Sequence, residues 1–157
     1  MEYSIRAMNP IEHPMLEEFL YLAIFQEEGQ PPLPREVIYQ PAIYAYIEGF
    51  GTQPHDHCLC VQVGEEIIGA AWVRVMHGYG YVGKGVPELA ISLYPQYRGM
   101  GLGTQLVKHM LDTLGQKGYT KLSLSVWKAN PAWHMYQRLG FAIVQQTERE
   151  YLMEYVF

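Results

Sequence analysis

The chain of 157 residues is 49% hydrophobic and 17% charged, which provides enough apolar material for one buried core and excludes an intrinsically disordered chain. Its 11 Lys and Arg and 16 Asp and Glu give a formal net charge of -5, whereas nucleic-acid binding favours a basic surface. No apolar run approaches the roughly 20 residues that span a bilayer, and the amino terminus lacks the pattern of a signal peptide. We therefore expect one domain over residues 1–157, in the cytoplasm, that binds neither nucleic acid nor membrane.

Two helical segments are expected in the first 50 residues. Apolar residues recur at helical spacing over 11–26, and the acidic, proline-rich stretch that follows ends this helix. A second helical pattern covers 35–48, where Pro41 should kink or split the helix. Several aromatic side chains of this segment either belong to the core or line an acceptor pocket, and the pattern leaves both readings open: Tyr39, Tyr44, Tyr46 and Phe50.

Strand-like alternation begins near residue 59. The segments 59–63 and 67–75 flank a short turn and predict an antiparallel hairpin. Cys58 and Cys60 share one face of the first strand in a geometry that is poor for a bridge, so we interpret both as reduced core thiols. The preceding run from His55 contains metal-ligand residue types without a second cluster, and we expect no metal site.

A strand, a helix and a strand follow a glycine-rich loop over 78–85. The strand is expected to end at Pro95, the helix runs over 102–114, and the next strand covers 122–126, which predicts a right-handed crossover between parallel strands. A short helix is then expected near 131–139. Two further strands complete the pattern, from Phe141 and over 149–157.

The turn between the strand and the helix carries the clearest chemical signal. Its glycines let the backbone approach a ligand closely, and the free N–H groups at a helix start bind phosphate oxygens. A P-loop would need a Gly-Lys-Ser/Thr sequence that is absent, and the dinucleotide pattern G-x-G-x-x-G, begun at Gly99, would place its third glycine at Thr104.

The pattern that does fit is R-x-x-G-x-G, at Arg98, Gly101 and Gly103, and in it the chain closely resembles the GCN5-related N-acetyltransferase (GNAT) family. A second segment, from Asn130 to Phe141, resembles the family's N-x-x-A-x-x-x-Y-x-x-x-G-F pattern with one residue fewer between Asn and Ala. Together the two motifs cover about a third of the chain, and the first 50 residues agree with the family in element order alone.

The resemblance implies an α/β fold with a mixed, mostly antiparallel sheet of about seven strands, a central parallel pair that splays apart, and about four helices. The cofactor's pantetheine arm would lie between the splayed strands, 88–94 and 121–127, and pair with backbone groups of Ile91 and Leu93. Asn130 would hydrogen-bond the pantetheine or cap the next helix. The resemblance further implies that the pyrophosphate is held by the loop residues Arg98, Gly99, Met100, Gly101, Gly103 and Thr104.

Two side chains are candidates for proton transfer. Tyr136 occupies the family's tyrosine position and would protonate the departing thiolate, although it could also be a core tyrosine. Glu88 would accept the amine proton, directly or through water, or it could be a solvated residue at a strand start. A backbone N–H near Ile91 would hold the thioester oxygen.

The resemblance therefore implies an enzyme that transfers an acetyl group from acetyl-CoA to a primary amine, by direct attack and without a metal. The acceptor stays open among small amines, peptides and proteins. Two alternatives remain: a noncatalytic acyl-CoA sensor, and a transferase that uses a hydroxyl acceptor or another acyl donor, for which His134 is the only histidine within the motifs. The apolar strand at 151–157 could add to a partner's sheet edge, which suggests a homodimer.

Overall fold

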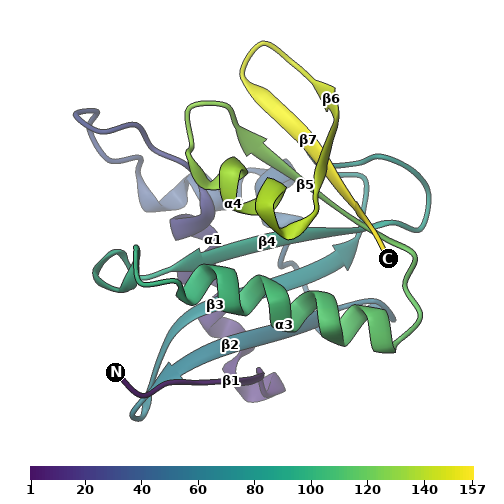
Figure 1. Cartoon of the computed structure of the whole chain (residues 1–157). Helices are drawn as coiled ribbons and strands as arrows, with labels where there is room; N and C mark the ends of the chain where they lie inside the picture. The colour runs from purple at the N-terminus through teal and green to yellow at the C-terminus, as the bar shows by residue number, and fades with distance from the viewer.

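The computed structural model describes all residues from 1 to 157 and forms one seven-stranded sheet with the order β1-β2-β3-β4-β5-β7-β6 (Figure 1). The strands are β1 (Ser4–Ala7), β2 (His57–Val63), β3 (Glu66–Val75), β4 (Pro87–Leu93), β5 (Lys121–Trp127), β6 (Ala142–Gln146) and β7 (Glu150–Val156). The α-helices are α1 (Leu16–Ala23), α2 (Pro41–Tyr44), α3 (Leu102–Gln116) and α4 (Ala132–Leu139). Only β4 and β5 are parallel, so the predicted mixed sheet with four helices is confirmed.

The amino-terminal region differs from the expected pattern. The helix predicted over 11–26 is a 3-10 segment, η1 (Pro10–Met15), followed by α1, because Pro14 lacks the N–H that a continuous α-helix needs. The helix predicted over 35–48 is likewise divided into η2 (Arg35–Tyr39) and the single turn α2, with extended backbone at Gln40 before Pro41. Strand β1 is an addition, since its four residues are too short to show an apolar alternation.

The two faces of the sheet bury separate cores. α3 lies across β2 and β3 on the near face in Figure 1, and α1 covers the far face. Alternation along β2 sends Leu59 and Val61 toward α3, whereas Cys58 and Cys60 pack with the α1 layer. Both cysteines are buried and unbridged, as predicted. None of the helices combines the length and apolarity that crossing a membrane requires.

The carboxy-terminal strand is not available to a partner's sheet. β7 pairs with β5 on one side and with β6 on the other, so both of its edges are occupied. The prediction that residues 151–157 extend a partner's sheet edge is therefore wrong. A short hairpin connects β6 to β7, and β7 also pairs with β5, so β6 becomes the outer strand.

The parallel pair separates almost as soon as it forms. Glu88 and Ser123 are its one registered pair, and beyond them β4 and β5 diverge (Figure 1). β5, β7 and β6 thus form an arm that turns away from β1–β4, with α4 packed against β5. Strand edges that would otherwise pair are left facing a gap in the middle of the sheet.

A buried ion pair fixes the segment that follows α2. Arg74 on β3 and Asp56 are 2% and 1% exposed, and two hydrogen bonds of 2.9 and 2.8 Å join them. The same guanidinium donates to the carbonyl oxygens of Ala45 (2.9 Å) and Glu48 (2.7 Å). Arg74 therefore holds the turn that carries Tyr46 against the sheet.

Replacing Asp56 by Asn is expected to lower the free energy of unfolding at pH 7 by about 2–3 kcal/mol, because the buried guanidinium loses its counter-ion. Burial alone would raise the pKa of Asp56, but hydrogen bonds from Arg74, Gly51 and Gln53 hold that pKa below its ordinary value. The ion pair thus stabilises the fold above the ordinary carboxyl pKa of about 3.9, and this stabilisation is lost as the pH falls through the lowered value of the folded state.

Urea denaturation of wild type and Asp56→Asn at several pH values tests this expectation. The difference between the two proteins should shrink toward zero in acid. Glu18→Ala, which breaks the exposed pair with Arg35, is the control and should unfold close to wild type at every pH. An undiminished difference at pH 3 would contradict the assignment of the effect to the ionised carboxylate.

Candidate active site

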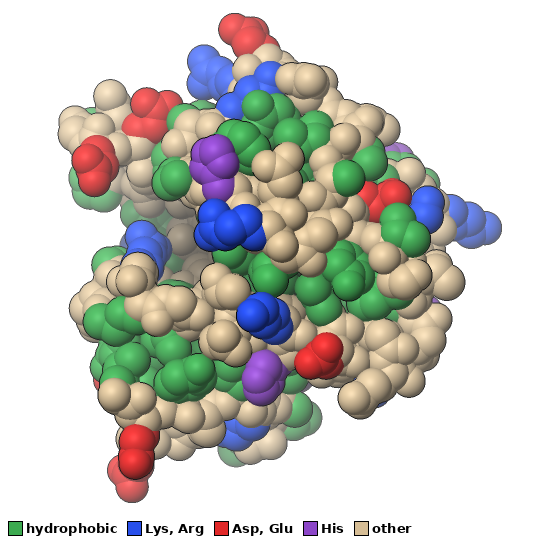
Figure 2. Space-filling view, in the orientation of Figure 1, with side chains coloured by type: hydrophobic (Ala, Val, Ile, Leu, Met, Phe, Trp, Pro, Cys, Tyr) green, Lys and Arg blue, Asp and Glu red, His purple; other side chains and the backbone are tan.

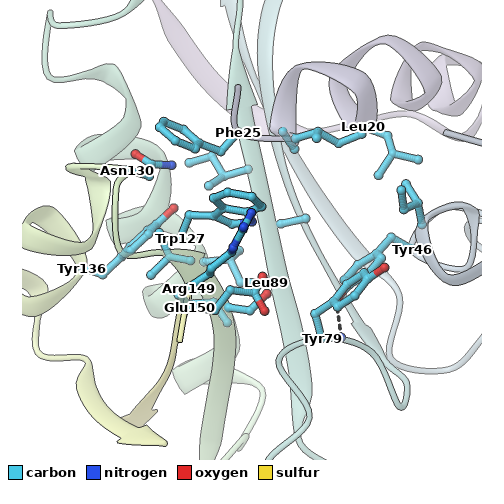
Figure 3. A pocket seen from close by; sticks show the side chains of 18 of the residues that line it. Leu20, Phe25, Tyr46, Tyr79, Leu89, Trp127, Asn130, Tyr136, Arg149 and Glu150 are labelled. Carbon is cyan, nitrogen blue, oxygen red and sulfur yellow. Dashed lines mark hydrogen bonds between the residues drawn. The ribbon is translucent and has the colours of Figure 1, made fainter. Parts of the chain in front are cut away.

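A cavity of about 640 Å³ occupies the gap between β4 and β5. It is closed by α1 and the turn after α2 on one side, and by the β6–β7 connection on the other (Figure 3). Most of its walls are apolar or aromatic. Its lining comprises Leu20, Ala23, Ile24, Phe25, Ile43, Tyr46, Tyr79, Leu89, Ala90, Ile91, Leu124, Ser125, Val126, Trp127, Asn130, Tyr136, Thr147, Glu148, Arg149 and Glu150.

The loop before α3 presents a continuous row of free backbone donors. Gln105 is the first residue of this helix whose N–H finds a main-chain acceptor, the carbonyl oxygen of Gly101 at 3.1 Å. The six preceding N–H groups, from Gly99 to Thr104, have no partner within the chain. Gly99 and Gly101 adopt positive φ angles of 76° and 80°, which turn successive N–H groups outward. The loop is thus a concave anion site at the positive end of a 15-residue helix.

The surroundings of this loop are basic. Figure 2 shows Lys and Arg side chains around the hollow beside the start of α3 and α4. Arg98 is exposed, and its Nε donates to the carbonyl oxygen of Leu93 (3.3 Å), which leaves the terminal nitrogens of its guanidinium without a partner in the chain. Met100 is exposed as well, at 56%. An anionic group at the loop would therefore meet backbone donors and a positive field together.

The backbone of β4 faces the gap at the predicted positions. Tyr94 N–H donates to the carbonyl oxygen of Ile68, toward β3, at 2.9 Å. Because main-chain groups of successive strand residues point to opposite neighbours, Leu93 and Ile91 present theirs toward β5. The two strands have separated at this level, so an extended ligand can pair with β4 there as an added strand would. Ile91 lines the cavity, whereas the Leu93 side chain packs beneath the start of α3.

Tyr136 on α4 projects its hydroxyl into the cavity from the β5 side (Figure 3). Its side chain is 7% exposed, its ring packs edge-on against Phe141 with centroids 5.8 Å apart, and its hydroxyl makes no hydrogen bond within the chain. Burial raises the pKa of Tyr136 to about 12, so the phenol stays protonated at neutral pH. A buried phenol that keeps its proton and faces a cavity is equipped to donate that proton.

Asn130 lies at the mouth of the same helix. Its Oδ1 accepts the N–H of Ala132 at 3.0 Å, so the residue caps the first turn of α4. It also lines the cavity near Tyr136, and its amide nitrogen has no partner in the chain (Figure 3). The two interpretations of Asn130 are therefore compatible, since capping uses only the oxygen.

Glu88 is 2% exposed and does not line the cavity. Its carboxylate accepts three hydrogen bonds, from Tyr46 Oη (2.8 Å) and from the N–H groups of Gly78 (2.9 Å) and Gly80 (3.1 Å). Burial raises the pKa of Glu88 above its ordinary value, although these hydrogen bonds oppose the shift. The sequence places Glu88 at the start of β4, but only the fold encloses it.

The loop over 78–80 must be glycine-rich for this arrangement. A Cβ on Gly78 would lie 2.6 Å from Tyr46 Oη and 2.7 Å from Glu88 Oε2, and one on Gly80 would lie 2.9 Å from the β5 backbone at Leu124.

The sequence did not decide whether four aromatic residues, Tyr39, Tyr44, Tyr46 and Phe50, belong to the core or to an acceptor pocket. In the structure, Tyr46 lines the cavity and the other three do not. The remaining walls come from residues that no sequence motif marked, among them Phe25, Trp127, Arg149 and Glu150.

The side chains of His55, Asp56 and His57 contact other residues of the chain. His55 Nδ1 and His57 Nε2 both lie within hydrogen-bond distance of Tyr119 Oη, at 2.7 and 2.9 Å. Asp56 is used by Arg74. These residues lie away from the cavity, so they take no part in the site.

The sequence model of the acetyltransferase (GNAT) family matches residues 19–141, and the chain belongs to this family. The match spans the glycine loop, both separated strands and the Tyr136 helix.

Individual relatives are acetyltransferases with different acceptors. The chain is 30% identical over 110 residues to thialysine N-epsilon-acetyltransferase of Mus musculus, a match that covers 64% of each chain, and 42% identical over 53 residues to streptothricin acetyltransferase of Streptomyces lavendulae, over 33% and 28% of the two chains. The fold is similar to that of the PaiA N-acetyltransferase of Thermoplasma acidophilum in complex with coenzyme A, with a TM-score of 0.73 at 18% identity and full coverage of both chains. It is also similar to the ribosomal-protein-S18-alanine N-acetyltransferase of Escherichia coli, with a TM-score of 0.68 at 17% identity over 99% and 94% of the chains.

Proposed function

We propose that this protein transfers an acetyl group from acetyl-CoA to a primary amine by direct attack within a ternary complex. The observation that carries the proposal is the row of six unpaired N–H groups in the glycine loop and the first turn of α3, which leads directly to the gap between β4 and β5. A phosphate-binding loop joined to an open strand edge and an apolar cavity matches the three parts of CoA: pyrophosphate, pantetheine and thioester.

The cofactor contacts follow from this arrangement. Backbone N–H groups of Gly99, Met100, Gly101, Gly103 and Thr104 hold the pyrophosphate, with Arg98 as a nearby charge. Main-chain groups of Ile91 and Leu93 pair with the pantetheine, and the amide nitrogen of Asn130 is free to contact it. The thioester then lies in the cavity beside Tyr136.

The chemistry needs a neutral amine, a polarised carbonyl and a proton for the leaving sulfur. A backbone N–H near Ile91 polarises the carbonyl, Tyr136 protonates the thiolate, and Glu88 is the carboxylate that takes up the amine proton. Neither cysteine lines the cavity, which supports direct transfer over an acyl-cysteine intermediate. No step requires a metal. Two reduced thiols also agree with a cytoplasmic enzyme.

An amine acceptor is supported by the acidic residues at the cavity. Glu148 and Glu150 line it from the β6–β7 connection, and the chain as a whole carries a net charge of -5, which attracts cations. The mouse relative is named for the N-epsilon group of thialysine, which agrees with an amine at the end of an extended side chain.

Calorimetric titration with CoA, acetyl-CoA and desulfo-CoA, beside a thiol-release assay over a panel of amines, tests the proposal. We expect micromolar binding of all three cofactor species, because the pyrophosphate and pantetheine contacts do not involve the sulfur, and amine-dependent release of free CoA. Folded protein that fails to bind CoA would overturn the proposal. Binding without release for every amine would favour the noncatalytic sensor instead.

A further inference from the structure

The carboxylate of Glu88 is separated from the cavity by one side chain. Glu88 is 2% exposed and absent from the cavity wall, whereas Tyr46, whose hydroxyl donates to Glu88 Oε2 at 2.8 Å, lines that wall. The other two contacts of the carboxylate are backbone N–H groups of the 78–80 loop. Tyr46 is therefore the side chain that joins the carboxylate of Glu88 to the cavity wall.

The hydrogen bonds of Tyr46 leave room for one more contact. A phenol oxygen donates once and has two lone pairs. Tyr46 donates to Glu88 and accepts the N–H of Tyr79 at 2.9 Å, which is the dashed contact in Figure 3. The second lone pair faces the N–H of Gly80, which also donates to Glu88 Oε2 at 3.1 Å. Because Gly80 shares its one proton with Glu88, an N–H group in the cavity can compete for this lone pair.

We propose that Tyr46 is a proton relay that carries the proton of the acceptor amine to Glu88. This inference rests on the proposed acetyl transfer and names the path by which its amine proton leaves. As the amine nitrogen bonds to the thioester carbon, its N–H bond breaks and the proton joins Tyr46 Oη. The original hydroxyl proton of Tyr46 passes to Glu88 Oε2 at the same time. After the amide has left, the reverse transfer returns the proton to water in the open cavity.

The electrostatics of the pair support a coupled transfer rather than a free phenolate. Burial, and then the adjacent Glu88 carboxylate, raise the pKa of Tyr46 above its ordinary value, so Tyr46 does not lose its proton without gaining another. Burial also raises the pKa of Glu88, which makes its carboxylate a better proton acceptor than an exposed one.

The placement fits the rest of the reaction as well. Tyr46 and Tyr79 lie on the opposite side of the cavity from Tyr136 and Asn130 (Figure 3). The group that removes a proton from the amine and the group that supplies one to the sulfur are thus on the two sides between which the thioester lies. Arg74, through its bonds to Ala45 and Glu48, fixes the turn that carries Tyr46.

Tyr46→Phe is the direct test, with hydrazine and thialysine as acceptor amines and thiol release as the readout. We expect kcat to fall about a hundredfold with either amine, while the Kd for CoA changes less than about threefold, because the variant loses only proton transfer. Tyr44→Phe is the matched control. Its hydroxyl also faces a carboxylate, Glu17 at 3.5 Å, but it does not line the cavity, and we expect wild-type kcat.

Two further readouts separate a relay from a structural contact. The double variant Tyr46→Phe/Glu88→Gln should be no slower than the slower single variant, because both substitutions interrupt one path. We also expect a difference when the rate is measured in mixtures of H₂O and D₂O. A plot of the wild-type rate against the deuterium fraction should be curved, because two protons move in one step. The same plot for Tyr46→Phe should be linear, because only one proton moves.

The outcomes are distinct. Wild-type kcat in a folded Tyr46→Phe protein, or additive losses in the double variant, would overturn the relay and leave the acetyl transfer in place. Wild-type protein that binds CoA but releases no thiol with any amine of the panel would overturn the proposed function and the relay with it.

Discussion

Gly101→Val should weaken CoA binding by about a thousandfold or more. Gly101 adopts a φ of 80° with no atom near its missing Cβ, so the obstacle to a side chain is the backbone conformation and not space. Valine would rotate the loop out of this conformation and redirect the N–H groups from Gly99 to Thr104. Hydrogen bonds to charged groups contribute about 1.5–3 kcal/mol each, and losing two or three of them gives this effect.

The other end of the same helix supplies the matched control. Gly118 follows α3, has a φ of 85°, and likewise has no atom within 4 Å of a built Cβ. Gly118→Val should lower the melting temperature about as much as Gly101→Val, because both place a β-branched residue at positive φ, yet it should bind CoA within about threefold of wild type. Isothermal titration and thermal unfolding of both variants decide the matter. Equal affinities in the two variants would remove the loop from the cofactor site.

Tyr136→Phe should lower kcat about a thousandfold while the affinity for CoA stays near that of wild type. General acid catalysis contributes about 10²–10⁴-fold, and the leaving thiolate would otherwise depart unprotonated. The ring contact with Phe141 survives the substitution, and the hydroxyl has no partner to lose within the chain, so the fold should not suffer.

Tyr155→Phe is the control for this experiment. Tyr155 packs against the same Phe141, with ring centroids 5.4 Å apart, but it lies outside the cavity. Its variant should turn over at the wild-type rate. The measurement is steady-state thiol release with saturating acetyl-CoA, beside calorimetric binding of CoA. Full activity of Tyr136→Phe would assign Tyr136 to the core alone and require another proton donor.

The parts of the fold that the sequence predicts well are those set by short-range patterns. The stripe of apolar residues in α3 and the alternation in β4 and β5 can be recognised from a few neighbouring residues. The loop needs glycines because its backbone adopts positive φ angles. The parallel pairing of β4 and β5 then follows from the helix between them, because parallel neighbours need such a crossover connection. The glycine-rich loop and Tyr136 could be located because they lie in these segments.

The amino-terminal helices were harder to predict from the sequence, because prolines interrupt segments whose apolar spacing is typical of one continuous helix. The apolar spacing over 11–26 is compatible with one α-helix, but Pro14 divides it, and the four residues of β1 gain their strand conformation only by pairing with β2. The position of β7 between β5 and β6 is another such case, since an apolar strand carries no mark of which neighbours it will have.

By itself, the sequence determined the class of fold, the glycine-rich loop before α3 and the position of the tyrosine on α4, because each depends on residues close together in the chain. The tertiary structure alone decided that Glu88 is enclosed, since its partners Tyr46 and Gly78 lie 42 and 10 residues away. It also decided which aromatic residue reaches the cavity. Burial and hydrogen bonding are properties of what surrounds a side chain, and for Glu88 and Tyr46 those surroundings come from distant segments that only the folded chain brings together.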